Sequence, residues 1–199
     1  MIGVVDYGTG NIGSLGNALA TLNLPFVHSA DREKLAACDW LLLPGVGAFG
    51  PARESLADTG LIPFVSEWVA ADKRLLGICL GMQLLFTWSE ERGRHQGLDL
   101  IPGQVVKIKG APRTVHMGWN EVTAADGINS LVPAPGYAYF VHSFHCVPND
   151  PAAVVAWTDY GGPVAAVVHQ GSTVGVQFHP EKSQRFGLDL LLRFNDGDI

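Results

Sequence analysis

A cysteine flanked by glycines stands out among the apolar residues 74–86. Residues 77–81 read Gly-Ile-Cys-Leu-Gly, which has the form G-x-C-x-G. This is the thiol form of the nucleophile elbow, where the reactive residue occupies a sharp turn between a strand and a helix. Neighbouring glycines avoid side-chain clashes across such a turn, and the helix N-terminus stabilises a thiolate. Cys79 is therefore a candidate nucleophile, although a free cysteine without this context is usually a buried structural residue.

A candidate base lies 179 − 79 = 100 residues further along the chain. Residues 176–183 read "VQFHPEKS", so His179 follows an apolar run and precedes Pro180 and Glu181. An imidazole that takes the thiol proton needs a carboxylate on its other nitrogen to fix tautomer and orientation. Glu181 can supply that carboxylate, and Pro180 stiffens the backbone between the two. Taken singly, His179 could be an ordinary strand-end residue and Glu181 a first-turn helix acid, but the order Cys-His-Glu favours a triad.

The remaining histidines belong to no comparable motif. We expect His28, His95, His116 and His169 to be surface or structural residues. His142 and His145 lie in "YFVHSFHC" on a predicted strand, and of these two only His142 is kept as a minor candidate near the pocket.

Strands and helices alternate over the first ninety residues. We predict strands at 1–7, 25–30, 40–45 and 74–79, and helices at 11–23, 31–38, 53–60, 61–72 and 80–92, with Asn11 and Asp31 opening the first two helices. This alternation is typical of a mostly parallel sheet flanked by helices. The expected fold class is therefore α/β.

The second half of the chain changes character. Predicted strands at 104–109, 137–147, 152–160, 163–170 and 173–178 are joined by short Gly/Pro turns, and a helix at 183–195 follows them. These strands add an antiparallel portion to the sheet. Without an internal repeat or a linker, residues 1–199 are expected to form one domain.

Composition narrows the function class. The 199 residues carry a net charge of -6, which argues against nucleic-acid binding. Three widely spaced cysteines show no CxxC pattern, so we expect neither disulfides nor a metal site, and a cytoplasmic location. The N-terminus lacks the basic region of a signal peptide, and apolar stretches are interrupted before membrane-spanning length.

Several motifs, taken together, resemble the class I (triad) glutamine amidotransferases. G-x-C-x-G-x-Q after a strand and a distant His-Pro-Glu carry this resemblance. Finer matches resemble the glutaminase subunits of imidazole glycerol phosphate synthase, namely "DYGTGN" (6–11), "LPGVGAFG" (43–50), "GICLGMQLLF" (77–86), "HMGWN" (116–120), "YFVHSFH" (139–145) and "FHPEKS" (178–183). They run in order over nearly the whole chain, without a departure at a motif position.

The resemblance implies hydrolysis of the glutamine side-chain amide through a cysteine thioester. Cys79 would attack the amide carbon, His179 would move the proton and Glu181 would orient His179. The oxyanion would be stabilised by the backbone N–H of Leu80 and by the loop at Pro44–Gly47, where Val46 and Gly47 are the candidates.

The same resemblance implies a set of substrate-binding residues. Gln83 lies four residues after Cys79, so both fall on one helix face, and the Glu91 carboxylate suits an α-ammonium. Alternatively, Gln83 is a residue on the helix surface and Glu91 is a solvated charge. Backbone groups complete the predicted glutamine site, which comprises Gly45, Gly47, Gln83, Glu91, Ser143 and Phe144.

No cofactor is implied, but a partner is. The ammonia would pass to a cyclase subunit that makes imidazole glycerol phosphate and an aminoimidazole carboxamide ribonucleotide in histidine biosynthesis, in a heterodimer. Asn11, Trp119, Asn120 and Lys182 are the predicted docking residues. Alternatively, Asn11 belongs to an ordinary turn, Trp119 is an aromatic core residue and Lys182 is a charge at a helix end. We expect the lone chain to be nearly inactive until partner binding sets the "PGVG" loop.

Three other functions are compatible with these motifs. The chain could be a glutaminase for guanylate, anthranilate or pyridoxal phosphate synthesis, although "HMGWN" and "DYGTGN" should be absent there. It could be a cysteine peptidase or hydrolase with the same triad, acting without a docking face. It could also be a non-catalytic regulatory protein on this scaffold, although Cys79, His179 and Glu181 are all present.

Overall fold

The computed structural model describes residues 1–111, 113–125 and 130–198. Its strands are β1 (Ile2–Val5), β2 (Phe26–Ser29), β3 (Trp40–Leu43), β4 (Leu75–Ile78), β5 (Phe86–Ser89), β6 (His95–Gln96), β7 (Ile101–Lys107), β8 (His116–Ala124), β9 (Gly136–His142), β10 (Phe144–Pro148), β11 (Val154–Asp159), β12 (Pro163–Gln170) and β13 (Thr173–Val176). Its α-helices are α1 (Ile12–Thr21), α2 (Arg32–Ala36), α3 (Phe49–Asp58), α4 (Leu61–Ala70), α5 (Leu80–Leu84) and α6 (Gln184–Asp196), and its 3-10 helices are η1 (Pro151–Ala153) and η2 (Pro180–Lys182).

Two sheets organise the molecule. The larger has nine strands in the order β2-β1-β3-β4-β13-β12-β11-β8-β9, parallel from β2 to β13 and antiparallel from β13 to β9. The smaller has the order β10-β7-β5-β6. The expected α/β class, a mostly parallel sheet with an antiparallel portion, is confirmed.

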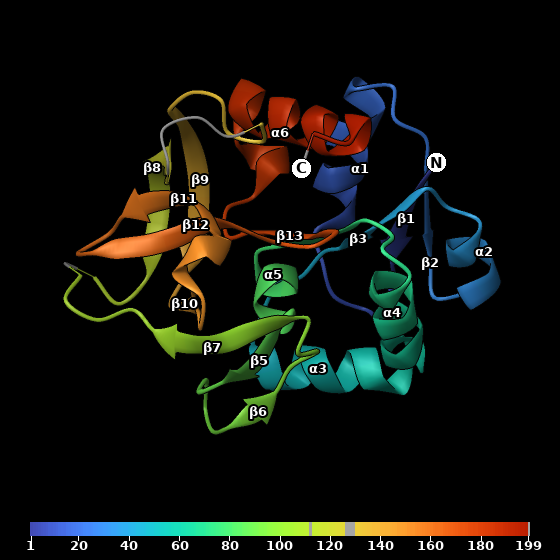
Figure 1. The fold of residues 1–199 in the computed structure, drawn as a ribbon, viewed down its shortest axis with the longest axis horizontal. Helices are drawn as coiled ribbons and strands as arrows, with labels where there is room; N and C mark the ends of the chain where they lie inside the picture. The colour runs from blue at the N-terminus through green and yellow to red at the C-terminus, as the bar shows by residue number, and fades with distance from the viewer. Residues whose placement is uncertain (112, 126–129, 199) are drawn as a thin grey trace.

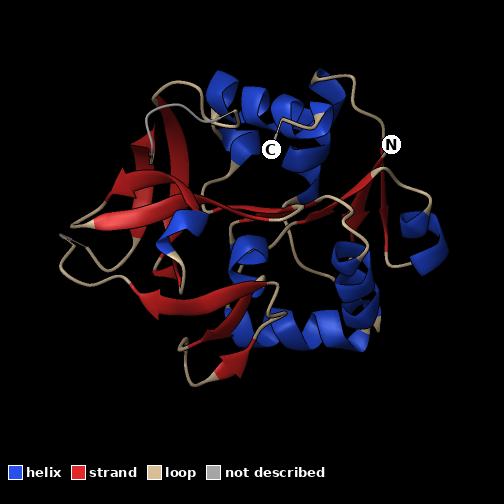
Figure 2. Cartoon of the chain, viewed as in Figure 1, coloured by secondary structure: helices blue, strands red, loops and turns tan. Residues whose placement is uncertain are grey.

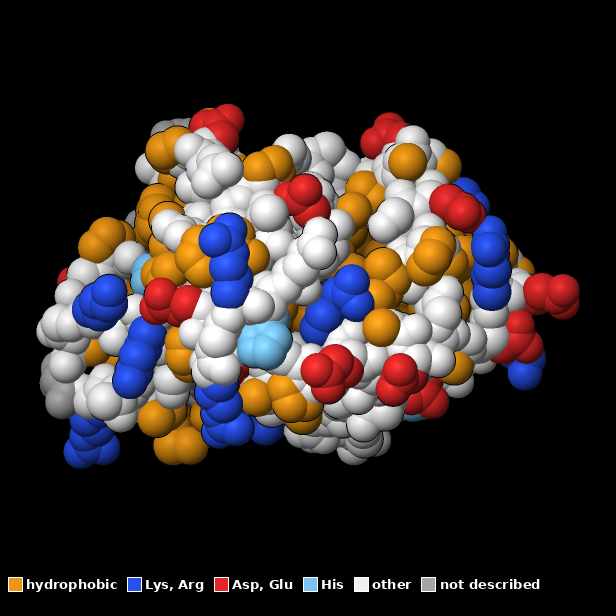
Figure 3. Space-filling view, turned by 90° about the horizontal axis from the view of Figure 1, so that it is seen from below, with side chains coloured by type: hydrophobic (Ala, Val, Ile, Leu, Met, Phe, Trp, Pro, Cys, Tyr) orange, Lys and Arg blue, Asp and Glu red, His pale blue; other side chains and the backbone are white. Residues whose placement is uncertain are grey.

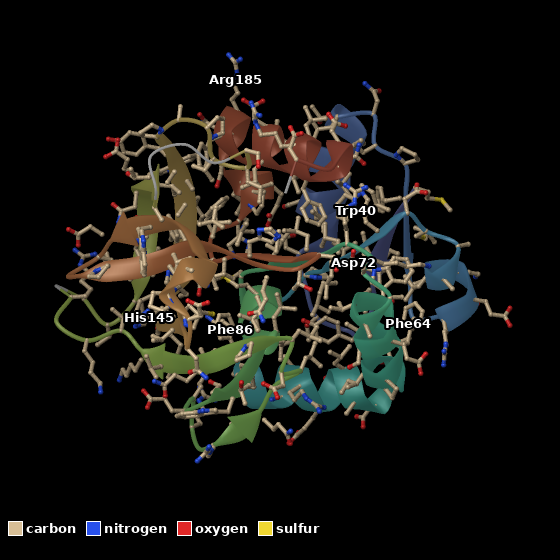
Figure 4. All side chains as sticks on the ribbon, viewed as in Figure 1. Trp40, Phe64, Asp72, Phe86, His145 and Arg185 are labelled. Atoms are coloured by element: carbon tan, nitrogen blue, oxygen red, sulfur yellow. The ribbon has the colours of Figure 1, made fainter. Side chains whose placement is uncertain are left out.

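Apolar side chains fill a layer on each face of the larger sheet. Helices α1 and α6 cover one face, whereas α3, α4, α5 and the smaller sheet cover the other (Figures 1 and 2). Figure 4 shows Trp40 on the α1/α6 side and Phe64 and Phe86 on the opposite side. Seen from below in Figure 3, Lys and Arg side chains are interspersed with Asp and Glu side chains.

The predicted elements are found to within a few residues at their ends, with two corrections, whereas strands β6 and β8 were not predicted. Asn11 and Asp31 cap α1 and α2 through their side chains, as expected. The helix predicted over 80–92 is wrong beyond residue 84, because Phe86–Ser89 pairs with β6 and β7 as strand β5. Aromatic and β-branched residues in "FTWS" fit a pleated, half-buried surface, and this tertiary pairing overrides the helical pattern.

The second correction concerns residues 137–147, predicted as one strand. The chain leaves the larger sheet after His142 and enters the smaller sheet at Phe144, so the segment forms two strands, β9 and β10. Ser143 is the bend between them. A period-2 pattern continues through such a bend and does not reveal it.

The parallel register brings the two halves of the candidate site together. Strands β4 and β13 are neighbours, with Ile78 opposite Val176, so both strands end at one edge of the sheet. Cys79 and His179 follow these two ends. Ligand sites of open α/β sheets lie at the carboxyl ends of the strands.

Candidate active site

Cys79 occupies the turn between β4 and α5 in a conformation that few non-glycine residues adopt. Its backbone angles are φ 54 and ψ −108, and its N–H donates to the carbonyl of Val176 at 2.7 Å. Both flanking glycines are sterically required. A Cβ at Gly81 would lie 1.9 Å from the Leu43 carbonyl oxygen, and one at Gly77 would lie 2.8 Å from the Met82 nitrogen. The structure thus has the strained geometry of a nucleophile elbow.

His179 and Glu181 form a buried pair beside Cys79. The imidazole Nδ1 lies 2.9 Å from the Glu181 Oε1, and each side chain is 3% exposed. Because a carboxylate accepts there, Nδ1 carries the proton and Nε2 is the nitrogen available to the sulfur. Ser183 fixes the segment, since its Oγ donates to the His179 carbonyl at 2.7 Å and accepts from the Tyr139 N–H at 2.9 Å.

The partners of His179 determine its charge. Burial by itself lowers the pKa of the imidazole, but hydrogen bonds to Cys79 and Glu181, together with their negative charges, outweigh burial and raise that pKa from 6.5 to about 10. His179 therefore holds a proton at neutral pH whenever Cys79 and Glu181 are anionic.

The loop Pro44–Gly47 packs directly on the elbow. A Cβ at Gly45 would lie 2.7 Å from the Gly81 nitrogen, so only glycine allows this approach. Gly47 has φ +101, in the region that favours glycine. The Tyr7 hydroxyl donates to the Pro44 carbonyl at 2.5 Å, and burial raises the pKa of Tyr7 to about 12.

One cavity of about 330 Å³ unites most of the predicted residues. Its lining comprises Val46, Gly47, Cys79, Leu80, Gln83, Glu91, Val115, Val141, His142, Ser143, Phe144 and His179. Of the predicted catalytic, oxyanion and substrate residues, only Gly45 and Glu181 are outside this lining, and each packs against a residue that belongs to it, Leu80 and His179 respectively.

Two glutamine side chains link the cavity wall to the sulfur. Gln83 Nε2 donates to the Phe144 carbonyl at 3.0 Å and to the Gln177 Oε1 at 3.2 Å. Gln177 Nε2 in turn lies 3.8 Å from the Cys79 sulfur. The amide of Gln83 is therefore oriented, with both protons of its nitrogen engaged.

Glu91 reaches the cavity from a loop and not from a helix. It lies after β5, and its Oε2 accepts from the Phe49 N–H at 2.8 Å. That bond fixes the carboxylate at the N-terminus of α3 and at the cavity wall. Glu91 is therefore not the freely solvated charge that was the alternative interpretation.

The predicted docking residues lie on the surface or at its margin. Asn11 caps α1, Trp119 is 46% exposed on β8, and Lys182 is exposed with its Nζ 5.9 Å from the centre of the Tyr139 ring. Asn120 donates to the Asp159 carbonyl at 2.7 Å. Exposed apolar residues cluster on the same β8–β9 hairpin, namely Met117, Trp119 and Tyr137.

Three residues of this region were missed by sequence reasoning. Gln177 is fully buried and contacts Cys79; as a lone polar residue in an apolar strand two positions before His179, it carried a usable signal. Tyr7 carried no signal for its bond to Pro44. His116, expected to be a surface or structural residue, is a buried one at 2% exposure, and what sequence reasoning missed is its contact with His142.

Within residues 1–111, 113–125 and 130–198, no three His, Cys, Asp or Glu side chains are grouped in a way that could hold a metal ion. Across the same residues, the helices are all too short or too polar to traverse a membrane.

Known proteins resemble this chain over its full length. A family model described as Glutamine amidotransferase class-I matches residues 4–194. Imidazole glycerol phosphate synthase subunit HisH of Shouchella clausii (strain KSM-K16) is 46% identical, covering 98% of this chain and 97% of that protein. The HisH subunit of Geobacillus thermodenitrificans (strain NG80-2) is 43% identical, covering 98% and 94%. A crystal structure of a glutamine amidotransferase has a TM-score of 0.76 at 18% identity, covering 98% of each chain, which supports the fold alone.

Proposed function

The chain belongs to the class-I glutamine amidotransferase family and, within it, to the HisH group, and from this premise we propose that it is the glutaminase of an imidazole glycerol phosphate synthase. It hydrolyses L-glutamine to glutamate and ammonia and passes the ammonia to a cyclase subunit for histidine biosynthesis. The observation that carries this proposal is the elbow cysteine beside a buried His179–Glu181 pair in one cavity.

Cys79 and His179 perform the bond changes. The thiolate attacks the amide carbon, and His179 donates a proton to the departing nitrogen, so ammonia leaves and a thioester remains. His179 then takes a proton from water, the hydroxide attacks the thioester, and the sulfur leaves as thiolate with release of glutamate. Glu181 keeps the imidazole oriented in both steps.

The oxyanion of each tetrahedral intermediate needs backbone donors. The Leu80 N–H is in the first turn of α5, where N–H groups have no intrahelical partner. A second donor comes from the loop at Val46 or Gly47, whose backbone is close to the elbow. Removing one such donor typically costs about 3 to 4 kcal/mol in the barrier.

The amino-acid end of glutamine is bound by polar groups on the cavity wall. Gln83 uses its nitrogen within the protein, which leaves its Oε1 to accept from the substrate ammonium. The Glu91 carboxylate pairs with the same ammonium. Backbone groups of Ser143 and Phe144 in the cavity lining, and of Gly45 packed against Leu80 beside it, complete the site.

The cyclase docks on the surface around Asn11, Trp119, Asn120 and Lys182, forming a heterodimer. Exposed Trp119 and Met117 on β8 support this assignment, because aromatic residues and methionine are enriched at interface centres. Docking sets the Pro44–Gly47 loop, so the lone chain is nearly inactive. We take residues 1–199 as one glutamine amidotransferase domain, and a cytoplasmic location fits three unpaired cysteines.

Glutamate release by the purified chain, alone and with its cyclase and the cyclase's nucleotide ligand, tests the proposal. We expect release to depend on the partner. Cys79→Ala should abolish glutamine use, while the pair still makes imidazole glycerol phosphate from added ammonia. Cys38→Ala, which replaces a buried cysteine away from the cavity, is the matched control.

The outcomes separate the competing functions. Glutamine hydrolysis that survives in Cys79→Ala would remove Cys79 as nucleophile. Full activity without a cyclase would favour a free-standing hydrolase, and no hydrolysis under any condition would favour a regulatory protein on this scaffold.

A further inference from the structure

A chain of side-chain hydrogen bonds connects β8 to the wall of the glutamine cavity. The Asn120 Nδ2 lies 3.2 Å from the His116 Nε2, and the His116 Nδ1 lies 3.0 Å from the His142 Nε2. The His142 Nδ1 lies 2.8 Å from the Phe144 carbonyl oxygen. The β8–β9 register places His116 directly opposite His142, which is why their rings meet.

The groups at the two ends of this series of hydrogen bonds determine which ring nitrogens of His116 and His142 carry a proton. A carbonyl only accepts, so His142 carries its proton on Nδ1 and has a lone pair on Nε2. His116 must then donate from Nδ1 and accept at Nε2. Asn120 satisfies that acceptor, because its nitrogen is identified independently by its 2.7 Å bond to the Asp159 carbonyl. One arrangement of two neutral imidazoles satisfies all these contacts.

Packing holds both rings in place and keeps them neutral. The His116 ring is stacked between Phe140 and Tyr160, with ring centres 4.5 and 4.0 Å away. Burial lowers the pKa of His116 to about 4 and is also the main cause that lowers the pKa of His142 to about 3. The tautomers therefore persist at neutral pH.

The last bond of the chain is made across the bend between the two sheets. His142 ends β9, Ser143 turns the chain, and Phe144 begins β10. The Phe144 carbonyl accepts from His142 on one side and from Gln83 on the other. His142, Ser143, Phe144 and Gln83 all line the cavity.

We propose that His142 is a positioning residue for glutamine binding, which holds the Ser143–Phe144 bend through its Nδ1 proton. His116 is a second positioning residue, which acts by fixing the tautomer of His142. This inference rests on the proposed function, because it assigns Ser143 and Phe144 to the glutamine site.

Glutamine kinetics of the chain with its cyclase test the roles of His116 and His142. His116→Phe keeps an aromatic ring between Phe140 and Tyr160 and removes both hydrogen bonds. We expect the KM for glutamine to rise about fivefold to tenfold, which is the effect of one hydrogen bond, with kcat changed little. His169→Phe, the same replacement on β12 away from the cavity, should leave both values unchanged.

A double variant separates positioning from packing. In His142→Asn the amide nitrogen donates to Phe144 without needing a fixed tautomer, so His116→Phe should have no further effect on KM in that background. An equal effect of His116→Phe in both backgrounds would overturn the proposal, as would an unchanged KM in the single variant.

Nitrogen-15 NMR of the wild-type chain gives a readout that needs no activity. We expect protonated Nδ1 and unprotonated Nε2 on both His116 and His142. An Nε2 proton on His142 would overturn the inference even if His116→Phe failed to fold. If the wild-type pair released no glutamate, the proposed function would fail, and the tautomers would still test the hydrogen-bond chain.

Discussion

His179 and His142 line the same cavity and are buried to nearly the same extent, yet their pKa values are shifted in opposite directions. Their exposed fractions are 3% and 7%. The pKa of His179 is raised to about 10, where hydrogen bonds to Cys79 and Glu181 outweigh burial, whereas the pKa of His142 is lowered to about 3, where burial dominates. Burial lowers the pKa of both imidazoles, and the anionic partners of His179 are what reverse the shift there.

The chemistry of each site follows from that difference. A protonated His179 can give its proton to departing ammonia, which a catalytic acid must do. His142 faces a carbonyl and a neutral ring, so it keeps one proton on one nitrogen and serves as a fixed donor. His179 can therefore transfer a proton during the reaction, whereas His142 keeps its proton on Nδ1.

Replacing the carboxylate of the triad should make His179 resemble His142. In Glu181→Gln the negative charge is lost and the amide can donate to the imidazole, which favours the wrong tautomer. We expect kcat for glutamine to fall by about a hundredfold to ten-thousandfold, and the pKa of His179 to fall in an NMR titration. Glu54→Gln, at an exposed position of α3, is the control for loss of one charge. A kcat within a few-fold of wild type would show that Glu181 does not orient His179.

The reverse change should make His116 resemble His179. In Asn120→Asp a carboxylate replaces the amide donor at the His116 Nε2, while Nδ1 still donates to His142, so the ring is stabilised with both nitrogens protonated. We expect the pKa of His116 to rise above its value of about 4 in an NMR titration of the lone chain. Asn149→Asp adds the same charge at an exposed position and should not move it. An unmoved His116 in Asn120→Asp would mean that Asn120 does not contact the ring.

The sequence was most informative where chemistry is local. The G-x-C-x-G and His-Pro-Glu segments each carry their own turn, so Cys79, His179 and Glu181 could be proposed without knowing the fold. Their meeting depends on β4 and β13 being neighbours, which the alternation of elements permits but does not specify.

The sequence was least informative where function depends on strand register. His116 belongs to no catalytic motif, and its contact with His142 exists only because the two residues are paired across β8 and β9. The bend at Ser143 and the end of α5 at Leu84 are likewise set by pairing within the smaller sheet. Local propensity cannot show where a chain changes from one sheet to another.

The smallest predicted effect is on stability, and it has opposite signs for the two arrangements. A histidine in the unfolded state has a pKa of 6.5, but folding lowers the pKa of His116 to about 4 and that of His142 to about 3. The unfolded state therefore binds more protons at acidic pH. Their contribution to the free energy of unfolding is complete above pH 6.5 and is lost as the pH falls toward those values, at up to about 1.4 kcal/mol per pH unit for each residue. The contribution of His179 is complete below pH 6.5 and is lost as the pH rises toward about 10.

Urea unfolding measured between about pH 5 and pH 9 should therefore show the free energy of unfolding falling toward both the acidic and the alkaline end. His116→Phe should make the acidic fall less steep and leave the alkaline fall unchanged. An acidic slope as steep in His116→Phe as in wild type and in the His169→Phe control would contradict the assignment of a neutral, buried His116.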